Sequence, residues 1–439
     1  MLKYSKENCG HAEGGGGDPL NRSWKLYTIQ DFISRGEAEL KTGPFGTQLH
    51  ASDYVKSGTP VINVRNIGFG DIKEEKLEFV SDETVNRLLS HLLVPNDIVF
   101  GRKGAVERHA FIKEKTAGWF QGSDCLRLRL KSPSADPRFV SYCLLTEDHQ
   151  QWMKNQCSHA ATMASLNQDI ISRISLHLPS LPTQRKIAAI LSAYDDLIEN
   201  NTRRIKILEE MAQALYREWF VRFRFPGHEK VRMVDSPLGR IAEGWEVKKL
   251  FDVAEVTYGH PFKSRLFTEE PTGSPVIRIR DINNNKTETF TNEHVSKKYF
   301  VENGDIIVGM DGDFYAGKWA GGKAYLNQRV VRFRPKKGLS RYYLYLALMA
   351  PIALLDSTIT GTTVAHLSDK DLRAINLTIP ESSICKTAKD ILDPIFDFEI
   401  KLNIKNSNLR RTRDLLLPKL ISGELNVETL GIKIGNMNS

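Results

Sequence analysis

The chain has 439 residues, of which 41% are hydrophobic and 26% are charged, and its formal net charge is +8. This length exceeds one ordinary hydrophobic core and predicts at least two domains, with a composition typical of soluble globular proteins. The basic excess hints at a polyanionic partner without identifying it. The five cysteines are scattered and form no Cys-x-x-Cys pair, which argues against a disulfide framework or a zinc site.

The N-terminal region lacks the apolar core of a secretion signal, and its glycine run at 14–17 predicts a flexible tail over residues 1–22. The longest apolar run, at 342–355, contains Pro351. That run is too short to span a bilayer and predicts a buried helix. We therefore expect a cytoplasmic protein without a membrane segment.

The chain contains two copies of one unit. The clearest match joins GTPVINVRNI at 58–67 to GSPVIRIRDI at 273–282, which share their apolar positions and differ at polar ones. The other matches, in chain order, are Trp24 with Trp245, Pro44–Phe45 with Pro261–Phe262, 96–104 with 304–312, 125–130 with 330–335, and 166–179 with 367–380.

Short segments in which apolar and polar residues alternate, bounded by Gly, Asn and Asp, predict strands in each copy. The strand-rich part of each copy is followed by an apolar helix candidate, at 139–153 and at 342–355. A long helix follows each copy. The sequence therefore predicts an α+β fold with a pseudo-twofold internal repeat. The expected parts are a flexible tail at 1–22, a first strand-rich domain at 23–179, a long helix at 180–224, a linker at 225–244, a second strand-rich domain at 245–380, a second long helix at 381–422 and a tail at 423–439.

The first long helix, for which Thr183 is the expected N-cap, carries a seam at four-three spacing, the pattern of a coiled coil. The seam positions are Ile187, Leu191, Tyr194, Ile198, Asn201, Ile205, Leu208, Ala212, Leu215 and Trp219. The positions 201 residues later are Ala388, Leu392, Ile395, Glu399, Leu402, Asn406, Leu409, Arg413, Leu416 and Leu420, a weaker seam with three polar residues.

Two copies related by a twofold axis require the two helices to run antiparallel, so we expect them to pair as an antiparallel coiled coil. The seam corresponds to about 50 Å of helix. Twofold DNA readers place their half-sites about 34–36 Å apart, and a rod of this length can hold two such readers. The alternative is that both helices are ordinary core-packing hairpins.

The sequence offers no catalytic constellation and no metal site. Residues 312–319 have the GxxxxGK spacing of a nucleotide loop, but Trp319 stands where Ser or Thr must bind magnesium, and Phe314 and Tyr315 are too bulky. The (Asn/Asp)-Pro-Pro-aromatic tetrapeptide of adenine methyltransferases is absent, because Pro-Pro never occurs. No His has metal-ligand spacing to another His or Cys.

Three polar segments recur between the repeated apolar anchors and suggest DNA contacts, because Arg reads guanine, Asn and Gln read adenine, and acids accept from cytosine. The DNA-binding candidates are Thr47, Gln48, Asn63, Arg65, Asn66, Arg102, Lys103, Lys263, Ser264, Arg265, Arg278, Arg280, Asp281, Asp311 and Lys318. For any single residue, the alternative is a solvated loop position that drifted after duplication. Arg65 and Arg280, identical in both copies, fit phosphate contacts or structural ion pairs better than base reading.

The chain resembles the specificity subunit of type I restriction-modification systems over about residues 24–425. The resemblance is carried by LPSLPTQRKIAAILSAYDDLIENNTRRI at 178–205, by LLLPKLISGEL at 415–425 and by the GDIIV-Gly segments. It implies two target recognition domains, each reading one half of a bipartite site in double-stranded DNA, and helices that set the gap between the halves. Residues 379–392 lack the Gln-Arg-Lys-Ile match of the first helix.

The resemblance also implies that the chain itself does no chemistry and holds no cofactor. Two methylation subunits are expected to bind along the helices, and restriction subunits complete the complex. S-adenosylmethionine, ATP and magnesium are expected on those partners. Two alternatives remain from the residues alone, a stand-alone DNA-modifying or DNA-cleaving enzyme and a coiled-coil scaffolding protein that does not bind DNA.

Overall fold

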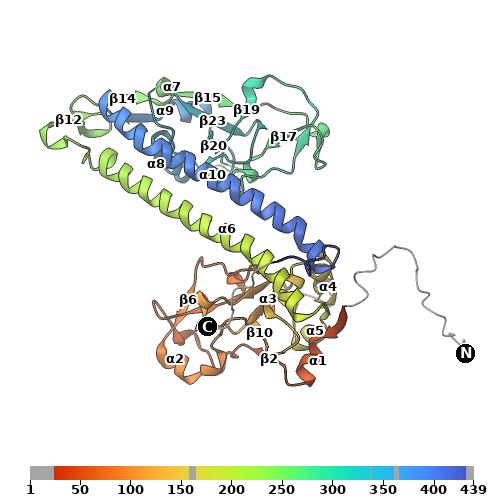
Figure 1. Cartoon of the computed structure of the whole chain (residues 1–439). Coiled ribbons are helices and arrows are strands. Elements are labelled where there is room, and N and C mark those ends of the chain that lie inside the picture. Colours follow the sequence, from red (N-terminus) through yellow and green to blue (C-terminus); the bar gives the residue numbers. More distant parts are fainter. Residues whose placement is uncertain (1–23, 158–164, 337, 360–364, 432–439) are drawn as a thin grey trace, which may run out of the picture. The chain divides into compact units, whose positions relative to one another are not determined.

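The computed structural model describes residues 24–157, 165–336, 338–359 and 365–431 (Figure 1). The tail predicted at 1–22 lies outside these residues. The chain divides into two compact units. The first unit comprises residues up to Asp195 together with those from Arg411 onward, and the second comprises Asp196–Arg410. Each unit therefore contains one strand-rich domain and a segment of both long helices.

The first unit is built on two small sheets, with one further strand pair. The main sheet has the order β2 (Ala38–Thr42), β10 (Cys125–Leu130), β7 (Ile98–Gly101), β8 (His109–Phe111) and β5 (Phe69–Gly70). The second sheet has the order β3 (Tyr54–Val55), β6 (Glu78–Val80), β4 (Thr59–Ile62) and β9 (Phe120–Gln121), and β1 (Lys25–Thr28) pairs with β11 (Ser175–Leu178). Its short helices are α1 (Ile29–Ser34), α2 (Asp82–Arg87), α3 (Pro137–Cys143), α4 (Glu147–Cys157) and α5 (Gln168–Ser172).

The second unit repeats this plan. Its main sheet has the order β15 (Ala254–Tyr258), β23 (Val330–Pro335), β20 (Ile306–Gly309) and β21 (Ala316–Lys318). Its second sheet has the order β16 (Phe267–Thr268), β18 (Phe290–Thr291), β17 (Ser274–Ile277), β22 (Ala324–Leu326) and β19 (Phe300–Val301), and β14 (Glu246–Lys249) pairs with β24 (Asn376–Ile379). Its helices are α7 (Leu250–Val253), α8 (Arg341–Thr358) and α9 (Asp369–Ala374).

The strand pairings confirm the predicted duplication and the α+β fold. In the first unit β10 pairs antiparallel with both β2 and β7, and in the second unit β23 pairs antiparallel with both β15 and β20. The second sheets share a parallel pair, β4 with β9 and β17 with β22. The repeated motifs 58–67 and 273–282 thus form the same strand and turn twice.

One proposed match within the repeat is wrong. Phe262 packs in a small core with Val276 and Tyr325, and the residue that packs on the corresponding strands of the first unit is Leu49, not Phe45. Leu49 is buried, whereas Phe45 is 59% exposed. The first unit therefore has a longer loop after β2, and the shared Pro-Phe dipeptide occurs in different structural positions.

The predicted linker and the described part of the predicted C-terminal tail both contribute to the folded units. Residues 225–244, predicted as a linker, contain the hairpin β12 (Met233–Ser236) and β13 (Gly239–Ala242). Phe225 packs on Trp245 with ring centroids 5.1 Å apart, which ties this hairpin to the core of the second unit. In the predicted tail 423–439, Val427 is buried in the core of the first unit, and residues 432–439 lie outside the described part.

The long helices are α6 (Leu181–Tyr216), which continues as a π-helical turn at Arg217–Val221, and α10 (Ser382–Ile421) (Figure 1). The predicted N-cap at Thr183 is wrong, because Ser180 precedes α6 and its hydroxyl accepts the Thr183 amide hydrogen. Every position of both predicted seams is buried or half-buried. None of the helices in the described residues is long and apolar enough to cross a membrane.

Each polar position of the second seam has a specific partner. In the second unit, Asn406 accepts a hydrogen bond of 2.9 Å from Asn201, and both are buried. Glu399, one heptad earlier, is ion-paired with Lys318. In the first unit, Arg413 donates to Asp195 over 2.6 Å. The second seam has fewer apolar residues than the first because three of its positions hold polar side chains, and each of these side chains has a specific partner. A buried Asn pair is a known means of fixing the register of paired helices.

Candidate nucleic-acid interface

The predicted polar segments of the first unit meet at one end of its main sheet. Thr42, at the end of β2, is opposite Leu126, and Gly101, at the end of β7, is opposite Cys125. The loop after β2, the turn after β7 and the turn before β10 therefore leave the sheet at the same end. Hydrogen bonds from the Gly122 amide to Ile62 and from the Leu166 amide to Arg102 add two further segments.

We call this surface the turn face. In the first unit it comprises residues 43–49, 63–66, 102–104, 122–124 and 165–168. The second unit has an equivalent turn face at 259–266, 278–281, 310–313, 327–329 and 365–369. There the backbone amides of Asn327, His260 and Leu367 donate hydrogen bonds to the carbonyls of Ile277, Leu326 and Met310, respectively. In each unit a rigid sheet thus presents three of the predicted polar segments on one surface.

Two candidates on the turn faces are internal turn caps. The side chain of Asn66 accepts from the Asn63 amide over 3.1 Å, and that of Asp281 accepts from the Arg278 amide over 2.9 Å. Asn66 is fully buried and also donates to the Lys73 carbonyl, while Asp281 is 7% exposed. The prediction that these two side chains contact bases is therefore wrong, because each closes its own turn and is inaccessible.

Lys318 is also not a DNA contact. It lies on β21 with its side chain 8% exposed, 2.9 Å from Glu209 of α6 and ion-paired with Glu399 of α10, and it packs on the ring of Tyr342. Burial alone would lower the pKa of Lys318, but attraction to both carboxylates raises it above its usual value. The GxxxxGK lysine therefore binds the long helices, and the adjoining Trp319 is fully buried.

The turn that follows β4 at 63–66, and β17 at 278–281, is here called the strand-end turn. Its polar residues have different partners in the two units. In the first unit Glu78 accepts from Asn63 over 2.7 Å and pairs with Arg65 at 2.5 Å. Arg278 occupies the position of Asn63 in the second unit and packs over Phe267, 5.9 Å from the ring centroid. Strand pairing places Thr289 where the first unit has Glu78.

Arg280 is the second-unit counterpart of Arg65. Its side chain is 63% exposed and lies 3.8 Å from the Asp281 carboxylate. Because Arg280 lacks the 2.5 Å carboxylate contact that holds Arg65, we expect it to be more available to an anionic partner.

The turn after the third strand of the main sheet carries an ion pair whose charges are reversed between the units. In the first unit Lys103 lies 3.4 Å from Asp124, and Arg102 beside it is half-buried. In the second unit the same positions are Asp311 and Arg329, which lie 3.1 Å apart. The sequence comparison singled out Lys103 and Asp311 but missed Asp124 and Arg329. The signal was available, since Asp124 and Arg329 each immediately precede a matched strand, at 125–130 and 330–335.

The loops after β2 and β15 carry five further exposed candidates. These are Thr47, Gln48, Lys263, Ser264 and Arg265. The Lys263 amide donates to Glu293 over 3.0 Å, and the Gln48 carbonyl accepts from Arg87 over 2.5 Å, so the backbones of both loops are held while the side chains face solvent.

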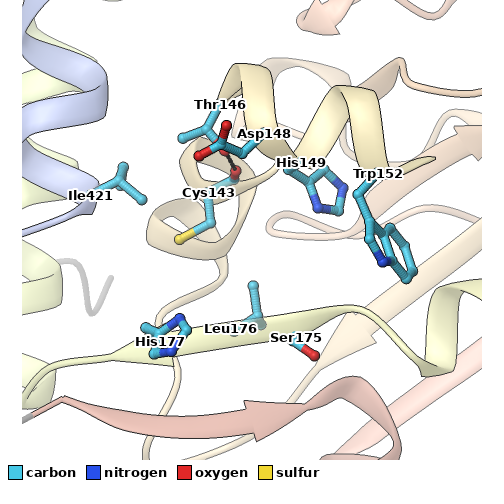
Figure 2. A pocket seen from close by; sticks show the side chains of 9 residues that line it. All are labelled: Cys143, Thr146, Asp148, His149, Trp152, Ser175, Leu176, His177 and Ile421. Atoms are coloured by element: carbon cyan, nitrogen blue, oxygen red, sulfur yellow. Dashed lines mark hydrogen bonds between the residues drawn. The ribbon is translucent and has the colours of Figure 1, made fainter. Parts of the chain in front are cut away.

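A cavity of about 270 Å³ lies in the first unit, and none of the residues that line it belongs to the turn face (Figure 2). His149 and Trp152 of α4 line one side, and Ser175–His177 of β11 lines the other. Burial lowers the pKa of His149 to about 4 and raises the pKa of the Cys143 thiol. Both shifts favour the uncharged form of the group.

The described residues contain no group of three or more His, Cys, Asp and Glu side chains placed to hold a metal ion. Their four cysteines, Cys125, Cys143, Cys157 and Cys385, are unpaired.

The family model for the type I restriction modification DNA specificity domain matches residues 23–210 and 242–409. The chain belongs to this family. The family match spans both strand-rich domains and confirms the resemblance drawn from residues 178–205 and 415–425. It also agrees with the internal repeat, since the model matches the chain twice.

Several specificity subunits are similar to this chain. The type I restriction enzyme MjaIX specificity subunit of Methanocaldococcus jannaschii is 27% identical over 306 residues, covering 66% of this chain and 70% of the relative. The MjaVIII specificity subunit of the same organism is 24% identical over 453 residues, covering 98% and 99%. A solved S subunit of a type I restriction-modification system from M. genitalium shares the fold, with a TM-score of 0.60, 17% identity, and coverage of 90% of this chain and 96% of that one.

Proposed function

We propose that this chain is the non-catalytic, sequence-reading subunit of a type I restriction-modification complex, acting on double-stranded DNA in the cytoplasm. Each turn face reads one half of a bipartite site, and the long helices set the distance between the halves. The observation that carries this proposal is the duplicated turn face, in which one rigid scaffold presents two different sets of polar side chains. Exposed loop residues then read bases or hold phosphates.

The partners in this proposal are two methylation subunits docked along the long helices, and restriction subunits in the complete complex. S-adenosylmethionine, ATP and magnesium belong to those partners. Exposed apolar side chains on the helices support docking. In the second unit they include Ile207 and Met211 on α6 and Ile391 and Phe398 on α10. Large apolar side chains that stay exposed at helical spacing are typical of a protein contact surface.

The test uses the chain purified alone and in complex with its methylation subunit. We expect the complex to methylate one two-part sequence, and the chain alone to methylate nothing and to hydrolyse no ATP. Exchanging residues 24–176 for the domain of another specificity subunit should change only one half of the sequence. Methylation by the chain alone, or a single undivided site, would contradict the proposal.

Measuring duplex DNA binding at several salt concentrations distinguishes the scaffolding alternative from the proposed function. Phosphate contacts release counterions, so duplex affinity should fall steeply as salt rises. A complex that assembles with its partners but has no salt-dependent affinity for duplex DNA would favour the scaffold.

A further inference from the structure

Arg329 lies on the second turn face, where the side chains of Asp311 and His366 hold it. Its Nε lies 3.1 Å from Asp311 Oδ2, and its Nη1 lies 3.3 and 3.4 Å from the ring nitrogens of His366. Asp311 Oδ1 in turn accepts from His366 Nδ1 over 2.6 Å. No residue in the described part of the chain hydrogen-bonds Nη2 of Arg329.

The backbones that carry this cluster are also fixed. The Met310 amide donates to the Arg329 carbonyl over 2.9 Å, and Asp311 forms an isolated antiparallel bridge with His366. The Arg329 side chain is nevertheless 48% accessible. The cluster therefore combines a hydrogen-bonded backbone with an accessible cationic side chain.

We infer that Arg329 reads a guanine in the half-site recognised by the second unit, with Asp311 and His366 as positioning residues. This inference rests on the proposed function. Bidentate binding of guanine O6 and N7 needs two guanidinium nitrogens in a fixed plane. Asp311 holds the Nε side, which leaves Nη2 and the weakly engaged Nη1 for the base.

The surrounding charges favour a base over a phosphate as the partner. Asp311 lies against the guanidinium, and Asp313 is exposed on the same turn. Two carboxylates repel a phosphate at this position, whereas the guanine edge offers neutral acceptors. In the first unit the cation of the equivalent pair is Lys103, which has no planar fork. The two half-sites should therefore differ at the base that this position reads.

The inference is tested with R329K and R329A in complex with the methylation subunit, against R240A as a control. Arg240 is an exposed arginine on the hairpin strand β13, outside the turn face. Methylation rates are measured on the wild-type site and on duplexes carrying each single base change. We expect both Arg329 variants to lose discrimination at one G·C pair of one half-site, by about tenfold or more, while R240A keeps the wild-type profile.

R329K separates base reading from simple charge, because lysine keeps the charge and loses the fork. If R329K retains wild-type discrimination, or if both variants lose activity equally on every duplex, Arg329 does not read a base. If the wild-type complex shows no two-part site, the proposed function itself fails. Altered thermal stability without a change in discrimination at one position would also overturn the inference.

Discussion

The first unit fixes its strand-rich domain to the long helices through a polar cluster centred on Asp195 of α6. Asp195 accepts from the Tyr142 hydroxyl of α3 and from Arg413 of α10, each over 2.6 Å. Arg413 and Asp195 keep 28% and 26% of their side-chain surface exposed, so solvent screens this pair. The cluster therefore orients the helices with only a modest desolvation penalty for its charged groups.

The second unit does the same with different residues. Glu399 of α10 accepts from the Tyr342 hydroxyl over 2.8 Å and pairs with Lys318 of β21. Glu399 is 1% exposed, and its burial raises its pKa against the opposing effect of Lys318. In both units a tyrosine and a cation meet a carboxylate of a long helix. The clusters stand at different positions of the repeat, since Glu399 matches Ile198 and not Asp195, and only the second cluster is deeply buried.

The strongest test of this difference is K318A. Removing the cation leaves Glu399 buried without its counter-charge, which typically costs about 3–5 kcal/mol. Urea unfolding should reveal this loss, and R413A should cost less, about 1–2 kcal/mol, because its pair is partly hydrated. K286A is the control, since Lys286 pairs with Glu288 fully on the surface and should change little. Equal losses for K318A and R413A would mean that burial does not distinguish the clusters.

Acid stability should also distinguish the units. His109 is buried, its Nε2 lies 2.7 Å from the Ser141 hydroxyl, and its pKa is lowered to about 3 by burial. Ala316 occupies the equivalent strand position in the second unit. Because the unfolded histidine titrates near 6.5, its contribution is fully present above that pH and is lost as the pH falls toward 3. The slope is at most about 1.4 kcal/mol per pH unit.

H109Q should reduce this dependence, because glutamine can still bond Ser141 but takes up no proton. Unfolding free energies of H109Q and the wild type are compared at several pH values between 6 and 4. Other carboxylates and histidines titrate in both proteins, so the difference isolates His109. Identical slopes would mean that His109 is accessible to protonation in the folded state.

The repeat could be read from the similarity of segments about 200 residues apart, and the strands and seam positions could be read from local periodicity. The structural roles of individual polar residues could not be read from the sequence. Asn66 and Asp281 differ between copies, as base readers would, yet their i to i+3 spacing from Asn63 and Arg278 already matches a turn cap. Lys318 could not be placed, because its partners on the long helices are more than 70 residues away in sequence, as Glu399 illustrates.

The Asn pair in the second unit offers a neutral counterpart to the Lys318 cluster. N201L should cost about 1–2 kcal/mol, because the Asn406 amide loses its 2.9 Å partner in a buried position. The double variant N201L/N406L should recover most of this loss, since two apolar residues can pack where two amides paired. A double-mutant cycle by urea unfolding measures the coupling. Additive losses would show that the two amides do not stabilise each other.

The smallest expected effect concerns the strand-end turns. R280A should weaken duplex binding several-fold and reduce the salt slope by about 1 if Arg280 contacts a phosphate. R65A should have less effect, because Arg65 is paired with Glu78 at 2.5 Å in the free protein and must give up that contact to bind DNA. E78Q then provides the matched control, since it removes the competing charge and should raise the contribution of Arg65. If R65A and R280A are equivalent in both the wild-type and the E78Q background, Glu78 does not restrain Arg65, and the two turns differ in sequence without differing in their affinity for DNA.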